Sequence, residues 1–213
     1  MSAAAETRRP GRPSLAGERR AQVLDAFLTL VGEHGLEAVT LDRVAQAAGV
    51  QRPVIRHFVG NRADLVRQAI GRLSEWYEAE VRTAVGAAPN VDALLDLLFG
   101  DTWTQGLSAH DRAFDALLLE ATRDAGTAAA VRRAYAMLLD EVAAALQRES
   151  PRAGESLVRD TAYAVVCLAE HNATMIALGH PPALAAAARR AAAVLTDGVR
   201  AAGPATSSAP DDG

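Results

Sequence analysis

Four side chains between residues 51 and 57 are suited to contacting a nucleic acid. Gln51, Arg52, Arg56 and His57 all carry hydrogen-bond donors, and no acidic residue interrupts them. Amide and guanidinium groups can bond to base edges, and a guanidinium can also bind a phosphate oxygen. This pattern favours a surface that binds in a nucleic-acid groove.

Catalytic chemistry has weaker support in the sequence. The five histidines are scattered, and there is no metal-ligand spacing, no glycine-rich phosphate loop and no nucleophile-elbow motif. Cys167 and His171 lie four residues apart on a predicted helix and could form an activated thiol. A small thiol in an Ala-rich and Val-rich helix is more commonly a packing residue. We therefore expect no enzyme, no catalytic residues, no metal site and no cofactor.

Two short helices are expected to position the donors. Apolar residues return at helical spacing within 41–48 and within 50–59, and Gly49 separates the two stretches. Thr40 can cap the first helix, and Gly49 can end it in a left-handed conformation. Pro53 falls in the first turn of the second helix, where its missing N–H has little effect. This arrangement is typical of a helix-turn-helix, predicted over residues 41–60.

The remaining sequence is also predicted to be helical, which makes the fold class all-α with about nine helices. Ala dominates the hydrophobic half of the chain and aromatic residues make up 4%, a balance that suits closely packed helices. No segment has the alternation of a strand. Helical periodicity predicts further helices over 18–34, 61–85, 90–105, 109–124, 127–149, 154–179 and 182–201.

The charge distribution favours a nucleic-acid partner at one end of the chain. Residues 1–72 carry a net charge of +4 and residues 73–213 carry −8, which gives −4 for the whole chain. Every fixed cation is an Arg because the sequence contains no Lys. A guanidinium can bind a phosphate or a guanine edge through two parallel hydrogen bonds. We therefore expect the N-terminal third to be the part that meets nucleic acid.

From Glu18 to Leu65 the sequence resembles the N-terminal domain of the tetracycline-repressor (TetR) family of transcription regulators. The similar segments are "RRAQVLDAFLTLVGEHGLEAVTLDRVAQAAGV" and "RHFVGNRADL". The family commonly has Ser where this chain has Gln51, Tyr where it has Arg56 and Lys where it has Arg62. The docking geometry is therefore transferred, and the family's base preferences are not.

The resemblance implies a site and its partners. Thr40 and Arg62 would bind phosphates on either side of the groove. The recognition face would consist of Gln51, Arg52, Pro53, Arg56 and His57. The implied partners are double-stranded operator DNA, a second copy of the chain in a homodimer, and an unidentified small-molecule effector that releases a repressor from a palindromic operator. The alternative is a helical dimer that binds a ligand or protein without operator DNA.

The arm that precedes the first helix carries a second basic motif. "RRPGRP" contains Arg8, Arg9 and Arg12 and resembles an AT-hook, in which an extended arm places Arg in a narrow minor groove. The alternative is a tail that only increases solubility.

The C-terminal part is expected to supply dimer contacts and an effector cavity, with ordinary core packing as the alternative for both groups. The residues expected at the dimer interface are Ala162, Val166, Ala169, Ala173, Ile176, Ala187, Ala191 and Val194. The residues from which the lining of an apolar cavity is expected are Trp76, Tyr77, Phe99, Trp103, Phe114, Tyr135, Met137, Cys167, His171 and Met175.

These interpretations divide the chain into four parts. A flexible basic arm covers 1–17, the helix-turn-helix domain 18–72, the effector-binding and dimerisation domain 73–202, and a disordered tail 203–213. No stretch reaches the roughly 18 apolar residues of a membrane span, and one cysteine excludes an internal disulfide. We therefore expect a cytoplasmic, nucleoid-associated protein without a membrane partner.

Overall fold

The computed structural model describes residues 15–104 and 108–202. These residues form ten α-helices and one short 3-10 helix, with no strand among them, which confirms the all-α class. No helix in these two ranges has both the length and the hydropathy that a membrane crossing requires. The elements are α1 (Leu15–His34), η1 (Leu36–Ala38), α2 (Leu41–Ala47), α3 (Arg52–Phe58), α4 (Arg62–Ala84), α5 (Val91–Phe99), α6 (Asp101–Thr104), α7 (Ala109–Ala121), α8 (Ala125–Glu149), α9 (Glu155–Ala177) and α10 (Pro182–Ala201).

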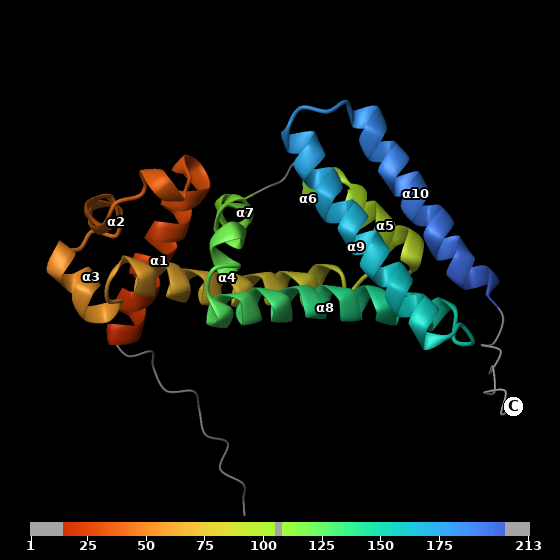
Figure 1. The fold of residues 1–213 in the computed structure, drawn as a ribbon, viewed down its shortest axis with the longest axis horizontal. Coiled ribbons are helices and arrows are strands. Elements are labelled where there is room, and N and C mark those ends of the chain that lie inside the picture. Colours follow the sequence, from red (N-terminus) through yellow and green to blue (C-terminus); the bar gives the residue numbers. More distant parts are fainter. Residues whose placement is uncertain (1–14, 105–107, 203–213) are drawn as a thin grey trace, which may run out of the picture.

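The helices are distributed along one long axis (Figure 1). The short helices α2 and α3 lie with α1 at one end, and the paired helices α9 and α10 lie at the other. Between them, α4 and α8 run side by side along the axis in the same direction. Helix α7 packs against α1 and also contacts α4. The helix-turn-helix is therefore at the end of the molecule opposite α10.

Two hydrophobic clusters support this arrangement. The first joins α1, α2, α3, the start of α4 and α7, with Phe27, Ile55 and Phe114 among its members. The second joins α4, α5, α8, α9 and α10. Trp76 on α4 packs against both clusters. Helix α4 thus contributes side chains to both hydrophobic clusters. The domain boundary expected at residue 72 stays a prediction.

Local signals in the sequence account for the helix-turn-helix. Thr40 caps α2, because its hydroxyl oxygen accepts a hydrogen bond of 3.3 Å from the Arg43 amide. Gly49 follows α2 with φ 61°, in the left-handed region that favours glycine. At the start of α4, Asn61 and Asp64 form a reciprocal capping box, with bonds of 3.0 and 3.1 Å. These interactions confirm the predicted cap and turn positions.

The single helix predicted over 90–105 is wrong. Helix α5 ends at Phe99, and α6 starts at Asp101. Gly100 between them is extended, with φ −82° and ψ 171°, and a Cβ built there would lie 2.4 Å from the Asp96 carbonyl oxygen. A glycine is required because the chain turns back closely on the last turn of α5. The helical spacing of apolar residues continues across Gly100, so the sequence pattern did not reveal the break between α5 and α6. It also did not reveal η1.

Candidate nucleic-acid interface

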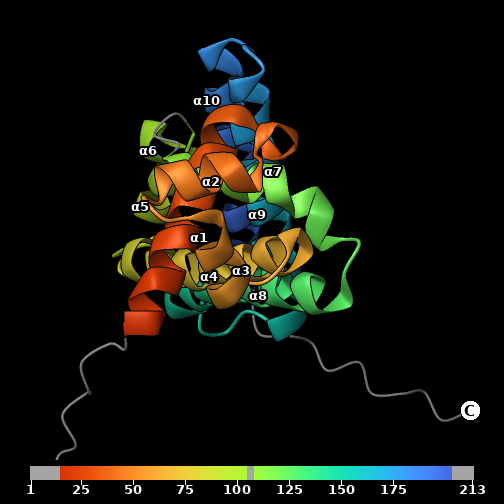
Figure 2. The ribbon, with the colours of Figure 1, turned by 90° about the vertical axis from the view of Figure 1, so that its left-hand side faces the viewer.

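Helix α3 presents the donor-rich surface that the sequence predicts. The side chains of its predicted recognition face are all exposed, namely those of Gln51, Arg52, Pro53, Arg56 and His57. Figure 2 shows α2 and α3 at the end of the molecule that faces the viewer. This surface is not covered by the remainder of the described chain. It is therefore sterically available to a partner as large as duplex DNA.

The opposite side of α3 is fixed to the protein interior. Ile55 is fully buried in the N-terminal cluster. The carbonyl oxygen of Phe58, at the end of α3, accepts a hydrogen bond of 3.0 Å from Arg20 Nε on α1. The Val59 carbonyl oxygen accepts one of 2.7 Å from Gln68 Nε2 on α4. Helix α3 is thus held from two neighbouring helices, and sequence periodicity did not identify either polar contact.

Arg52 has a partner within the helix-turn-helix. Its Nη1 lies 3.2 Å from both carboxylate oxygens of Asp42 on α2. Both side chains are more than half exposed, so the ion pair contributes at most about 1 kcal/mol to stability. Its main consequence is positional, because it holds the guanidinium across the α2–α3 turn. A base or phosphate contact by Arg52 would have to share or replace this pair.

The two residues expected to bind phosphate have structural roles here. Thr40 caps α2 as described above. The two terminal nitrogens of Arg62 donate to backbone carbonyls, Nη2 to Leu36 at 2.9 Å and Nη1 to Val39. Arg62 therefore joins the start of α4 to the segment that leads into α2. These bonds occupy two of the five N–H donors of a guanidinium, so a phosphate contact by Arg62 stays a prediction. Arg8, Arg9 and Arg12 lie outside the described residues.

An ion pair connects α4 to α1 next to this interface. Arg72 Nε and Nη2 bind the two carboxylate oxygens of Asp25 at 2.6 and 2.9 Å. The hydrogen bond to Asp25 is the main reason that the pKa of the Arg72 guanidinium is raised. This two-point contact ties the body of α4 to the helix that carries α3. Residues 47 positions apart in sequence form it, so periodicity could not predict it.

Several of the expected effector residues meet in one aromatic cluster between α4, α6, α7 and α8. Tyr77 is stacked on Phe114 with ring centroids 5.0 Å apart, and it also contacts Tyr135 at 6.0 Å and Trp103 at 6.5 Å. Tyr77 and Phe114 are buried, whereas Trp103 and Tyr135 are partly exposed. Glu170 on α9 adds a carboxylate, which accepts a hydrogen bond of 3.2 Å from the Tyr135 hydroxyl. The sequence analysis included all four of these rings among the candidate residues but missed Glu170 as a member of the same site.

The electrostatics of Glu170 are unusual for a carboxylate. Burial is the largest influence and raises its pKa to about 7, although the hydrogen bond from Tyr135 acts in the opposite direction. The negative charge of Asp115 on α7 raises the pKa further. The pKa of Asp115 is itself raised by burial and by Asp111. A surplus of negative charge is therefore concentrated beside the aromatic rings.

The other expected effector residues do not join this cluster. Trp76 stacks on His110 at 5.2 Å, and Phe99 is buried in the C-terminal cluster. Cys167, His171 and Met175 are exposed on α9, so the prediction that they line an internal cavity is wrong. They occupy the outward side of the helix, whereas the core takes the opposite side.

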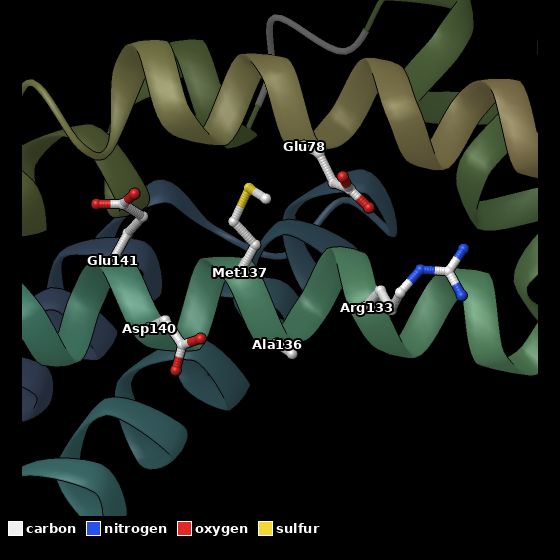
Figure 3. A pocket seen from close by; sticks show the side chains of 6 residues that line it. All are labelled: Glu78, Arg133, Ala136, Met137, Asp140 and Glu141. Atoms are coloured by element: carbon white, nitrogen blue, oxygen red, sulfur yellow. The ribbon is translucent and has the colours of Figure 1, made fainter.

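Met137 instead lines a surface pocket between α4 and α8 (Figure 3). Its volume is about 450 Å³. The lining residues are Glu78, Arg133, Ala136, Met137, Asp140 and Glu141. Four of these six carry charge, which does not fit the apolar lining expected of an effector cavity.

The expected dimer residues separate into two groups. Ala162, Val166 and Ala169 are buried within the chain, at 1%, 5% and 1% exposure. Their assignment to a dimer interface is wrong, because their side chains already pack in the core. Ala191 and Val194 are exposed, and Ala173, Ile176 and Ala187 are partly exposed. Leu195 of α10 is exposed as well, and so are two large apolar side chains that the prediction omitted, Tyr163 on α9 and Leu184 on α10.

Comparison with known proteins gives a consistent assignment. Residues 23–69 match the family model described as "Bacterial regulatory proteins, tetR family". The "HTH-type transcriptional regulator BetI" of Rhizobium meliloti (strain 1021) is 31% identical over 85 residues, which are 38% of this chain and 42% of that protein. The regulator of the same name from Burkholderia cenocepacia is 29% identical over 156 residues, 65% of this chain and 75% of that protein. A crystal structure of a TetR-family transcriptional regulator from Streptomyces coelicolor has a TM-score of 0.68 and 20% identity, covering 86% of this chain and 96% of that one.

A helix-turn-helix at one end of an all-helical chain, joined to a larger helical part, is the architecture that this chain shares with the Streptomyces coelicolor structure. The N-terminal part of the chain, over residues 23–69, is similar to the TetR family of bacterial regulatory proteins. The structural similarity, at 20% identity, concerns the fold. The matched stretch covers less than half of the Rhizobium meliloti relative, so the activity and partners of the whole protein are argued separately below.

Proposed function

We propose that the protein is a sequence-specific repressor that binds a palindromic operator as a homodimer and is released by a small-molecule effector. The observation that carries this proposal is the exposed, donor-rich face of α3, braced from behind by Ile55 and by hydrogen bonds from α1 and α4. A short helix with this geometry fits the major groove. On this face of α3, the side chains of Gln51, Arg52, Arg56 and His57 all supply hydrogen-bond donors.

Dimerisation is supported by the outward surface of α9 and α10. Tyr163, Leu184 and Val194 are 63%, 55% and 70% exposed. Apolar side chains of this size on adjacent helices are typical of an interface rather than of a solvated surface. A twofold interface at this end would pair two copies of α3, which one short helix needs in order to read a longer site. We therefore assign the dimer contact to these exposed residues.

Release by an effector is supported by the position of α4. The helix carries Tyr77 of the aromatic cluster and, little more than one turn earlier, Arg72 with its two bonds to Asp25 on α1. A ligand that shifts α4 at Tyr77 would thus change the placement of α1 and of the recognition helix attached to it. Allosteric coupling of this kind amounts to about 1–3 kcal/mol.

The test is binding to the DNA that flanks the protein's own gene. We expect fluorescence anisotropy to detect a complex with an inverted repeat in that DNA, and Arg56→Ala to weaken it by about 5- to 150-fold, the equivalent of about 1–3 kcal/mol for a lost bidentate base contact. Arg132→Ala is the matched control because Arg132 is exposed on α8, away from α3. Equal losses in both variants would indicate a general charge effect and refute the recognition face.

The competing function, a helical dimer that binds a ligand or protein without operator DNA, predicts a different result. Binding to the flanking DNA would then be no stronger than binding to an unrelated duplex of the same length. That result, with a correctly folded dimer, would contradict the proposed function.

A further inference from the structure

Glu170 is a partly buried carboxylate that has no ion pair with a cation of the described residues. In the ranges that the structure describes, its polar neighbours are the hydroxyl groups of Tyr135 and Tyr77 and the Trp103 indole, and the negative charge of Asp115 also acts on it. A buried carboxylate that meets no positive charge is unfavourable unless it takes up a proton or a cation binds to it. The protein supplies the donors that orient the carboxylate but not the charge that would neutralise it.

The side chains around Glu170 form surroundings that favour an organic cation. Tyr77, Trp103, Phe114 and Tyr135 bring four aromatic rings together, with centroid separations of 5.0–6.5 Å between Tyr77 and the other three. The face of an aromatic ring attracts a cation, and the attraction is larger where water is excluded. Trp103 and Tyr135 supply both a ring and a hydrogen bond to the carboxylate.

An unfilled hydrogen-bonding position lies in the same cluster. Tyr77 is 8% exposed, and its hydroxyl group has no hydrogen-bond partner of good geometry. It lies close enough to the Glu170 carboxylate to lower the pKa of Glu170 as a hydrogen-bond donor does, which leaves the lone pairs of its oxygen free to accept. Buried hydroxyl groups are rarely left without a partner. The Tyr77 oxygen is therefore a position at which a ligand N–H could be accepted.

We propose that this cluster binds an organic monocation that carries an N–H group and apolar substituents, with Glu170 as the counter-charge, the rings of Trp103 and Tyr135 against the cation, and the Tyr77 hydroxyl accepting its N–H. The inference rests on the proposed effector function and gives that effector a chemical class. Asp115 adds to the negative field without touching the cation. Neutral and anionic ligands of the same size would lack the attraction and would leave Glu170 unpaired.

The test uses the full chain and a simple probe in isothermal titration calorimetry without DNA. The probe is N,N-dimethylbenzylammonium, with neutral N,N-dimethylbenzamide and anionic phenylacetate as size-matched comparators. We expect the cation to bind at least about 10-fold more tightly than either comparator. Equal binding of all three, or no binding of the cation at millimolar concentration, would overturn the proposal.

Variants assign the binding to this cluster. Glu170→Gln should weaken the cation by about 10-fold or more, whereas Glu80→Gln, which removes an exposed carboxylate on α4, should leave it unchanged. Tyr135→Phe keeps the ring and should retain binding within about 3-fold, but Tyr135→Leu should lose about 5- to 30-fold. Tyr77→Phe should weaken the N–H cation more than benzyltrimethylammonium, which has no N–H. Unchanged affinity in both Glu170→Gln and Tyr135→Leu would refute the site.

Failure of this inference can be distinguished from failure of the proposed function. Calorimetry without DNA reports the cation alone, and anisotropy without the cation reports operator binding alone. A protein that binds its operator but not the cation contradicts this inference and leaves the repressor proposal intact. A protein that binds the cation but no operator does the reverse.

Discussion

The raised pKa of Glu170 predicts an unusual dependence of stability on pH. In the folded protein its pKa is about 7, whereas its ordinary value is 4.5. The folded state therefore holds this proton more tightly than the unfolded state does. The corresponding stabilisation is fully present below about pH 4.5 and is lost as the pH rises through about 7. This direction is opposite to that of a carboxylate in a salt bridge.

The size of the effect follows from the two pKa values. Linkage between them gives a loss of about 2 kcal/mol in the free energy of unfolding between pH 5.5 and pH 8. Glu170→Gln replaces the protonated acid by a neutral group of the same shape, which can still accept the hydrogen bond from Tyr135. The variant should therefore exceed the stability of the natural protein by about 1 kcal/mol at pH 5.5 and by about 3 kcal/mol at pH 8, so that the gap widens by about 2 kcal/mol between the two.

Urea denaturation followed by circular dichroism at both pH values measures this difference. Protein concentration must be the same throughout, because dimerisation contributes to apparent stability. Glu80→Gln is the control for loss of one exposed negative charge, and its curve should stay parallel to that of the natural protein. If the Glu170→Gln curve were also parallel, Glu170 would titrate as an ordinary surface acid. The electrostatic description of the cluster would then be refuted.

Three further predictions concern the turn, the α1–α4 ion pair and the dimer. Gly49→Ala should destabilise the protein by about 1–2 kcal/mol because the φ of Gly49 is 61°. Gly71→Ala, inside α4, should instead stabilise the protein by about 0.5–1 kcal/mol. Thermal unfolding of the two variants measures both effects, and equal effects would contradict the argument from backbone strain at Gly49. A double-mutant cycle of Asp25→Asn and Arg72→Met should give a coupling of about 1 kcal/mol in urea unfolding, and zero coupling would show that the pair does not join the helices. Val194→Glu should convert the dimer to monomer in sedimentation velocity, and an unchanged dimer would exclude the outer surface of α10.

The helix-turn-helix could be predicted from the sequence because its determinants are local. Thr40 caps a helix that begins at the next residue, and Gly49 adopts the left-handed conformation that a turn between two short helices requires. The exposed face of α3 followed from the apolar positions Val50, Ile55 and Phe58, because a set of inward positions at helical spacing fixes the opposite face of a helix. Each of these inferences uses residues within a few positions of one another.

Three of the expected dimer residues, Ala162, Val166 and Ala169, were assigned to the wrong side of α9. This helix has apolar residues on two sides, and periodicity does not indicate which side packs against the same chain. The core takes Ala162, Val166 and Ala169, together with Val165. Tyr163 and Met175 remain outside and exposed. Only the positions of α8 and α10 decide between the two sides, and those positions depend on the whole fold.

The cluster around Glu170 shows why a buried charged site is harder to predict than a recognition helix. Its rings come from α4, α6, α7 and α8, and its carboxylate comes from α9, so Glu170 lies 35 residues from Tyr135, its hydrogen-bond partner. In the sequence, Glu170 is one acid in a helix that also carries exposed acids. Its burial beside Tyr135 distinguishes it, and burial is a property of the packed helices. A search for one acid that faces several aromatic rings requires the folded structure. In this protein such a search leads to Glu170, and the missing counter-charge is the reason why we propose an organic cation as its ligand.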